Sequence, residues 1–120
     1  LLQSFGFKNG VPLDSDFVFD VRCLPNPHWE PHLRALTGVD PDVAAYLEAT
    51  PDVGAMFDSI RDFLERWLPA FEAENRAYMS VSIGCTGGRH RSVSIVEDLR
   101  SFFSEQSVSL DIIHRDIDKS

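Results

Sequence analysis

Apolar positions along the chain switch between the spacing of two that is typical of strands and the spacing of three to four that is typical of helices. The clearest alternation runs from Phe17 to Arg22, where Phe17, Phe19 and Val21 would share one face of a strand. Other segments rich in β-branched and aromatic residues predict three more strands: 4–10, as a strand or extended arm that ends in an Asn-Gly turn, 78–83, and 107–113.

Three helices are predicted between these strands. Asp40-Pro41 and Thr50-Pro51-Asp52 each place a capping residue before a proline, which is a helix start signal. The second signal begins the longest helix, and Pro69 is expected to kink or restart it near its end. The third helix covers about 90–103. We expect the apolar stripe of the long helix to face the core: Val53, Met56, Phe57, Ile60, Phe63, Leu64, Trp67, Leu68 and Phe71.

Strands that alternate with helices predict an α/β fold, a single compact domain over residues 1–120 with a small, partly parallel sheet flanked by helices. Ligands of such sheets bind beyond the carboxyl ends of the strands. The loops that follow Arg22 and Ile83 would therefore face one another at the same edge of the sheet.

The glycine-rich segment 85–92 lies between a predicted strand and a predicted helix, as an anion cradle would. Glycines allow a tight turn whose N–H groups converge, and the helix dipole adds positive potential. Arginine and histidine side chains supply cationic donors. The alternative is a tight turn whose arginines face water, and the spacing matches neither a Walker A loop nor the dinucleotide pattern. The predicted ligand-binding residues are Thr86, Gly87, Gly88, His90, Arg91 and Ser92.

The loop 24–31 contains three prolines, which fix the backbone and disfavour helix. Such stiffness suits a loop that presents side chains to a ligand. We expect Asn26 and His28 to contact the group attached to the anion. Three cations are candidates for the rim of the pocket, although an ion pair with Asp20 is an alternative for the second of them: Lys8, Arg22 and Arg89.

Cys85 and Arg91 support a different hypothesis, because C-x5-R followed by serine is the spacing of the phosphate loop in cysteine-dependent phosphatases. A helix start and nearby cations would lower the thiol pKa, as a thiolate nucleophile requires. The general acid of such an enzyme would be Asp20 or Asp40. Cys85 is equally interpreted as a small buried residue at a strand end, and we expect a binding domain rather than an enzyme.

Composition narrows these hypotheses. The chain has 120 residues, 43% of them apolar, and its apolar runs are too short to span a bilayer, so no membrane partner is expected. Two cysteines do not form a disulfide framework, which favours a reducing cytoplasm. Zinc binding by His28 and His32 is disfavoured by the neighbouring prolines, and no metal is expected. A net charge of −8 argues against a general electrostatic grip on nucleic acid.

The two ends of the chain carry further expectations. Residues 114–120 form a mixed-charge tail that we expect to be partly mobile. The first residue is Leu1 rather than methionine, so we expect a piece of a longer chain, and the pattern leaves homo-oligomerisation open.

Several of these motifs occur in the same order in one known family. The chain resembles the C-terminal domain of the RapZ/YvcJ family of bacterial proteins over nearly its whole length. The resemblance is carried by Ser4-Phe5-Gly6-Phe7-Lys8, Phe19-Asp20-Val21-Arg22, Leu24-Pro25-Asn26-Pro27-His28-Trp29 and Gly84-Cys85-Thr86-Gly87-Gly88-Arg89-His90-Arg91-Ser92.

The resemblance implies a regulatory domain that senses an amino-sugar phosphate, glucosamine-6-phosphate, within an RNase adapter that binds small regulatory RNAs. It places the sugar phosphate at His28, Thr86, Gly87, His90 and Arg91. It also implies an upstream P-loop domain that binds ATP or GTP, with no cofactor in the present domain.

RNA or an RNase would then be a further partner, and five cations are candidates for RNA contacts: Lys8, Arg22, Arg89, Arg115 and Lys119. The tail also carries Asp111, Asp116 and Asp118, whose negative charges oppose RNA. Of the two functions that the resemblance implies, we therefore expect ligand binding rather than RNA binding in this chain.

Overall fold

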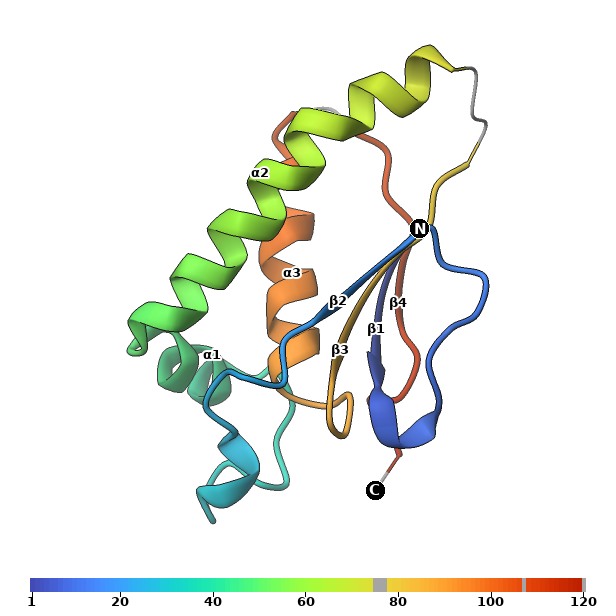
Figure 1. Ribbon diagram of the computed structural model, residues 1–120. Coiled ribbons are helices and arrows are strands. Elements are labelled where there is room, and N and C mark those ends of the chain that lie inside the picture. The colour runs from blue at the N-terminus through green and yellow to red at the C-terminus, as the bar shows by residue number, and fades with distance from the viewer. Residues whose placement is uncertain (75–77, 107, 120) are drawn as a thin grey trace.

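A computed structural model describes residues 1–74, 78–106 and 108–119, and within them the chain forms one four-stranded sheet. The strands are β1 (Leu2–Gly6), β2 (Phe17–Asp20), β3 (Val81–Cys85) and β4 (Ile112–His114). Their order is β2-β3-β1-β4, and every neighbouring pair is parallel. All four carboxyl ends therefore lie at the same edge of the sheet (Figure 1).

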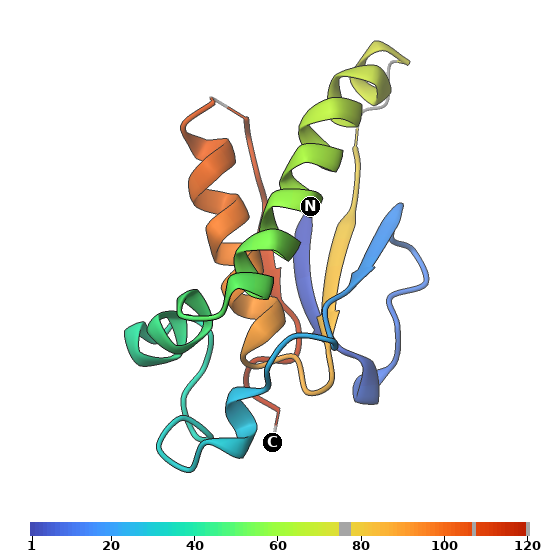
Figure 2. The ribbon, with the colours of Figure 1, turned by 60° about the vertical axis from the view of Figure 1, so that its left-hand side comes forward.

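The helices of the described residues lie on one face of this sheet, as Figures 1 and 2 show. They are α1 (Pro41–Glu48), α2 (Pro51–Ala73) and α3 (Arg91–Ser104), and short 3-10 turns at Phe7–Asn9 and Pro27–Trp29 follow β1 and β2. The predicted α/β class is confirmed, with a sheet that is parallel throughout and helices packed on one side.

The core lies between the sheet and these helices, and the strand register explains which residues enter it. Leu2 is aligned with Val81, and Val81 with Phe17, so alternate residues of neighbouring strands face α2 and α3 together. Phe63 of α2 packs edge-on against Phe17, with 5.1 Å between the ring centroids. The period-2 and helical patterns of the sequence thus predict the buried faces correctly.

The ends of the strands differ from the sequence prediction. The segment 78–83 was predicted as a strand, but β3 begins only at Val81, because Ser80 is turned toward Asp16, whose carboxylate accepts the Ser80 N–H at 2.8 Å. The segment predicted at 107–113 is a strand only from Ile112 to His114, and Ser107 lies outside the described residues. Apolar alternation identifies faces, whereas strand ends depend on such local polar contacts.

The long helix continues through Pro69 to Ala73, so it does not restart at Pro69, which was one of the two alternatives predicted there. Its C-terminal end extends beyond the sheet, as Figure 1 shows, and Trp67 in the apolar stripe is 43% exposed. Among the described residues, no helix has the length and apolar content needed to cross a membrane.

The two ends of the α2 stripe should contribute unequally to stability. Ile60→Ala removes a side chain that is 1% exposed and should lower the free energy of unfolding by about 2–5 kcal/mol. Trp67→Ala removes a side chain that is 43% exposed and should cost about 1 kcal/mol or less. Urea denaturation of both variants measures the difference, and equal losses would contradict the arrangement of α2 described here.

Candidate anion pocket at the carboxyl edge of the sheet

The loops that follow β1, β2 and β3 surround a pocket of about 310 Å³. Residues far apart in the sequence meet there because parallel strands end at one edge. Six of the eight predicted ligand contacts and two of the three predicted rim cations line this pocket, and Arg22, Gly88 and Ser92 do not. With Trp29 and Cys85, the lining is Lys8, Asn26, His28, Trp29, Cys85, Thr86, Gly87, Arg89, His90 and Arg91.

A second hollow, of about 340 Å³, lies near the start of the sheet strands. It is lined mainly by apolar residues of α2 and of the segments around Leu1 and Leu110, together with Glu72 and Asp111. Apolar walls with carboxylates disfavour an anion, so the pocket at the carboxyl edge is the site relevant to the sequence motifs.

The β3–α3 turn is built against the main chain of β1. Gly88 has a φ of 78°, and a Cβ there would lie 2.5 Å from the Gly6 nitrogen. Glycine is therefore required at Gly88 both for its backbone conformation and for this close approach. A hydrogen bond of 3.2 Å from the Lys8 N–H to the Thr86 carbonyl joins the two segments further along.

The Cys85 sulfur lies beneath this turn, and the residue as a whole is 2% exposed. It contacts the Ser92 hydroxyl at 3.2 Å and accepts the Gly88 N–H at 3.3 Å. Burial alone would raise the pKa of the Cys85 thiol, but these hydrogen bonds outweigh burial and the pKa is lowered. Gly88 and Ser92, predicted as ligand contacts, are thus directed at the sulfur and do not line the pocket.

Arg91 ties the two sides of the pocket together. One of its terminal nitrogens donates to the carbonyls of Arg22 at 2.8 Å and Leu24 at 3.0 Å, and the other donates to the Thr86 hydroxyl at 3.4 Å. The side chain is buried at 3% exposure. Arg91 therefore fixes the loop after β2 against the β3–α3 turn, a structural role that the sequence motif alone did not indicate.

Two buried nitrogens at the pocket have no hydrogen-bond partner among the described residues, His90 Nε2 and Arg91 Nε. His90 is 6% exposed, and burial lowers the pKa of its imidazole, although hydrogen bonds with the backbone of Leu33, Arg34 and Leu36 oppose this shift. Buried polar atoms in folded proteins are nearly always hydrogen-bonded, so these two nitrogens are available to a further partner.

The proline-rich loop is held in one conformation by its own hydrogen bonds. The Asn26 side-chain oxygen accepts the His28 N–H at 3.1 Å, and Arg34 Nε donates to the His28 carbonyl at 2.8 Å. The His28 and Trp29 rings meet edge-on with 5.4 Å between centroids. The loop places Asn26, His28 and Trp29 at the pocket, and these hydrogen bonds add to the constraint that its prolines predict.

The three predicted rim cations differ in their surroundings. Arg22 does not line the pocket, because it forms a 2.7 Å ion pair with Asp20 and lies over the Phe7 ring. The hydrogen bond from Arg22 lowers the pKa of the exposed Asp20 carboxyl. Arg89 lines the pocket while donating to the carbonyls of Ile117 and Ala35. Lys8 lines the pocket with an exposed side chain.

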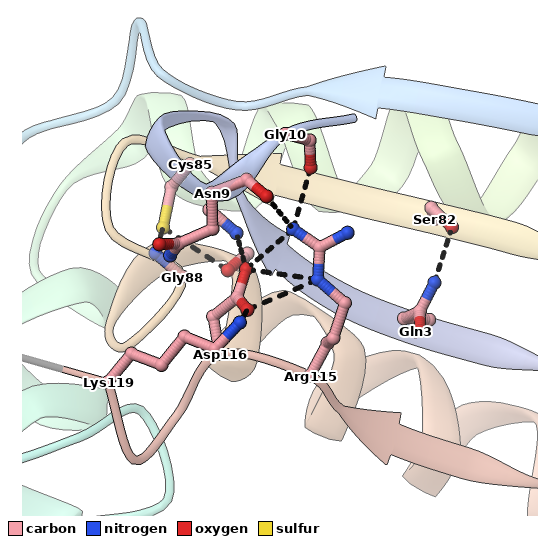
Figure 3. A network of polar contacts seen from close by, with 11 residues as sticks. Gln3, Asn9, Gly10, Ser82, Cys85, Gly88, Arg115, Asp116 and Lys119 are labelled. Atoms are coloured by element: carbon pink, nitrogen blue, oxygen red, sulfur yellow. Dashed lines mark hydrogen bonds and ion pairs between the residues drawn. The ribbon is translucent and has the colours of Figure 1, made fainter. Parts of the chain in front are cut away.

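The segment after β4 is docked rather than free, which corrects the expectation of a mobile tail for its described part. Asp116, which Figure 3 shows beside Arg115 and Lys119, is fully buried. Its carboxylate accepts the Gly6 N–H at 2.7 Å. Arg115 and Lys119 pair with the same carboxylate, each at 2.8 Å. Sequence reasoning missed this residue because an aspartate among arginine and lysine has the pattern of a solvated charge run.

The acids proposed as proton donors do not line the pocket. Asp20 is paired with Arg22, and the Asp40 carboxylate accepts the Thr37 N–H at 2.7 Å. The residues that the structure describes contain no group of three histidines, cysteines or acids placed to hold a metal ion.

Fold and site together define a class: a parallel α/β domain with a strand–glycine turn–helix pocket at the carboxyl edge of its sheet. The chain belongs to the RapZ C-terminal domain family, whose sequence model matches residues 1–118.

Its relatives are longer proteins. The chain is 63% identical over 118 residues to a nucleotide-binding protein of Thioalkalivibrio sulfidiphilus, covering 98% of this chain and 41% of that protein. It is 56% identical over 115 residues to a nucleotide-binding protein of Chromohalobacter salexigens, covering 96% of this chain and 39% of that protein. The chain thus spans about two fifths of the length of these curated relatives.

The buried carboxylate of Asp116 predicts a pH-dependent contribution to stability. Burial opposes its ionisation, but hydrogen bonds from Arg115, Lys119 and Gly6 outweigh burial and hold the pKa of this carboxyl well below its usual range. Its stabilisation is therefore present above pH of about 4 and lost as the pH falls below that value. Asp116→Asn should lower the free energy of unfolding at pH 7 by on the order of 2 kcal/mol.

Urea denaturation between pH 7 and pH 2.5 measures this effect. The gap between the parent and Asp116→Asn should narrow below pH of about 4. Asp118→Asn, at an exposed neighbouring position, is the matched control and should change stability little. A gap that is independent of pH, or an equal loss in the control, would contradict the docked carboxylate.

Proposed function

We propose that this domain is a regulatory module that binds a phosphorylated metabolite, in the first instance an amino-sugar phosphate such as glucosamine-6-phosphate. The observation that carries the proposal is the buried, unpartnered His90 Nε2 at a pocket lined by the start of α3 and by Lys8, Arg89 and Arg91. A phosphoryl oxygen would supply the partner that this nitrogen lacks.

The local charge of the pocket supports an anion in spite of the net charge of −8. Its described lining contains three basic side chains and two histidines but no aspartate or glutamate. The N-terminus of α3 adds the positive end of a helix dipole. Acids elsewhere on the surface are screened over about 8 Å at physiological salt.

The identity of the sugar rests on family membership rather than on the pocket itself. Among the described lining residues there is no carboxylate to pair with an ammonium group, so an amino group would meet only neutral acceptors. Glucosamine-6-phosphate and glucose-6-phosphate are therefore the pair of ligands to compare first. ATP and GTP belong in the same panel, because the relatives named above are nucleotide-binding proteins.

RNA binding, and with it a role in an RNase adapter, is less well supported for this domain alone. Of the five candidate cations, Arg22 pairs with Asp20, and Arg115 and Lys119 pair with Asp116. A cation that is already paired with a carboxylate contributes little to RNA affinity, because that affinity depends on cations that displace counterions from the phosphates. The relatives of this chain are longer proteins, and RNA and RNase contacts are proposals for proteins of that length.

Lys8→Gln is the cleanest test of the phosphate site, because Lys8 lines the pocket without the structural bonds of Arg91. Loss of one charged contact should raise the Kd for glucosamine-6-phosphate roughly fivefold, about 1 kcal/mol, and reduce its dependence on salt. Titration calorimetry measures both, with glucosamine as the unphosphorylated comparison, which should not bind.

Arg100→Gln is the matched control for Lys8→Gln. It removes an exposed cation of α3 that pairs with Glu97, away from the pocket, and should leave the Kd unchanged. Equal affinity of Lys8→Gln and the parent for every phosphorylated compound would place the ligand elsewhere.

A second candidate function, a cysteine-dependent phosphatase, is favoured by one observation: the lowered pKa of the Cys85 thiol under the β3–α3 turn. In such a reaction the thiolate attacks phosphorus, the ester P–O bond breaks, and water later hydrolyses the phosphocysteine. Burial of Cys85 at 2% exposure and the lack of an acid among the described lining residues favour binding instead.

An aryl phosphate such as p-nitrophenyl phosphate separates the two functions, because its leaving group needs no general acid. The binding proposal expects no turnover by the intact chain. Turnover that Cys85→Ser abolishes and that Cys23→Ser, at an exposed cysteine, leaves intact would establish the phosphatase.

A further inference from the structure

The pocket has room for more than a phosphate group. Its volume of about 310 Å³ reaches the range of sites that hold small organic ligands, roughly 300–1,000 Å³. The anion-binding groups of Thr86, Gly87, His90 and Arg91 all come from the β3–α3 turn. The rest of a bound molecule must therefore meet the loop after β2, which forms the facing side.

The largest apolar surface on that loop is the indole of Trp29, which is 73% exposed. Trp29 nevertheless lines the pocket, whereas the other tryptophan of the chain, Trp67, lies on α2. A tryptophan with most of its surface in water contributes little of the hydrophobic stabilisation that a buried indole provides. Beside a pocket, such a ring is a contact surface for a ligand.

The backbone that carries the indole is held by a hydrogen bond within the loop, and the ring itself contacts His28. The backbone N–H of Trp29 donates to the Asn26 carbonyl at 3.1 Å, and Pro27 in the same turn is buried. The His28 ring stands against the indole at an interplanar angle of 82°. A pre-positioned aromatic ring costs little ordering entropy on binding.

The chemistry of the facing side suits a saccharide ring. A pyranose presents a face of C–H groups, which packs on an aromatic ring, and an edge of hydroxyls, which needs polar partners such as Asn26 and His28. Extended polyol chains offer hydroxyls but no continuous C–H face. The residues lining this side thus distinguish ligands by their ring, independently of their phosphate.

We infer that Trp29 determines the specificity of the pocket for cyclic sugar phosphates. Its indole packs on the sugar ring while the phosphate lies at the β3–α3 turn. The inference rests on the proposed phosphate site and adds to it the class of molecule that the phosphate carries. Trp29 contributes nothing to the phosphate contact itself, so the two contributions are separable by experiment.

The test compares glucose-6-phosphate with its open-chain relative sorbitol-6-phosphate and with inorganic phosphate, by titration calorimetry on the intact chain. The parent should prefer the cyclic compound by about tenfold, and Trp29→Ala should bind both sugar compounds alike. Trp29→Phe should retain most of the preference. Trp67→Ala should keep it in full, because Trp67 lies outside the pocket.

Inorganic phosphate separates this inference from the proposed function. Unchanged phosphate affinity in Trp29→Ala supports a contact with the sugar, whereas an equal loss for phosphate and for glucose-6-phosphate makes Trp29 merely structural and overturns the inference. A ring preference that survives Trp29→Ala also overturns it. If the parent binds neither phosphate nor any sugar phosphate, the proposed function falls and the inference with it.

Fluorescence gives a second readout that needs no change at Trp29. The chain contains two tryptophans, so Trp67→Phe leaves Trp29 as the single tryptophan. Saturating glucose-6-phosphate should shift its emission to shorter wavelength, because the ring passes from water into contact with the sugar, while saturating inorganic phosphate should not. Identical spectra with both compounds would contradict the stacking contact.

Discussion

The pocket depends on the buried guanidinium of Arg91. A charge removed from water is tolerated only where hydrogen bonds replace its hydration. Here the carbonyls of Arg22 and Leu24 provide them from one loop, and the Thr86 hydroxyl provides another from the turn. The same charge therefore holds two loops together and supplies positive potential to the space between them.

The other side of the turn is fixed by β1 and by the segment after β4. Gly6 touches the Gly87-Gly88 main chain, and its N–H is bound by Asp116. Arg115 and Lys119 neutralise this acid, so its charge does not oppose an anion in the pocket (Figure 3). An acidic protein can in this way keep a pocket lined by cations, because Asp20 and Asp116 are paired with cations of their own.

Much of this arrangement follows from the sequence. The alternation at Phe17 and Phe19, the stripe on α2 and the glycine turn at 85–92 predict the layers and the edge that carries the pocket. These patterns are local and depend on residue type and spacing. The meeting of the loops after β2 and β3 follows in addition from the parallel order of the strands.

The contacts that the sequence did not reveal are those between distant segments. Nothing in the residue types shows that Arg91 donates to carbonyls of the loop after β2, or that Ser92 and Gly88 are directed at the Cys85 sulfur. Asp116 lies in a segment of mixed charge, which in the sequence is typical of solvent-exposed acids. Such roles depend on tertiary contacts. A sequence motif therefore predicts where a site lies better than it predicts which contact each of its residues makes.

The close approach of Gly6 and Gly88 makes the two halves of the pocket unequal in their capacity for change. Where main chain meets main chain there is no side chain to exchange, shorten or repack, so a Cβ at either glycine would collide with backbone atoms. The facing loop lies outside the core and tolerates substitution at its exposed positions. Replacements are therefore accommodated at exposed positions of the loop after β2, such as Trp29, and excluded where Gly6 meets Gly88.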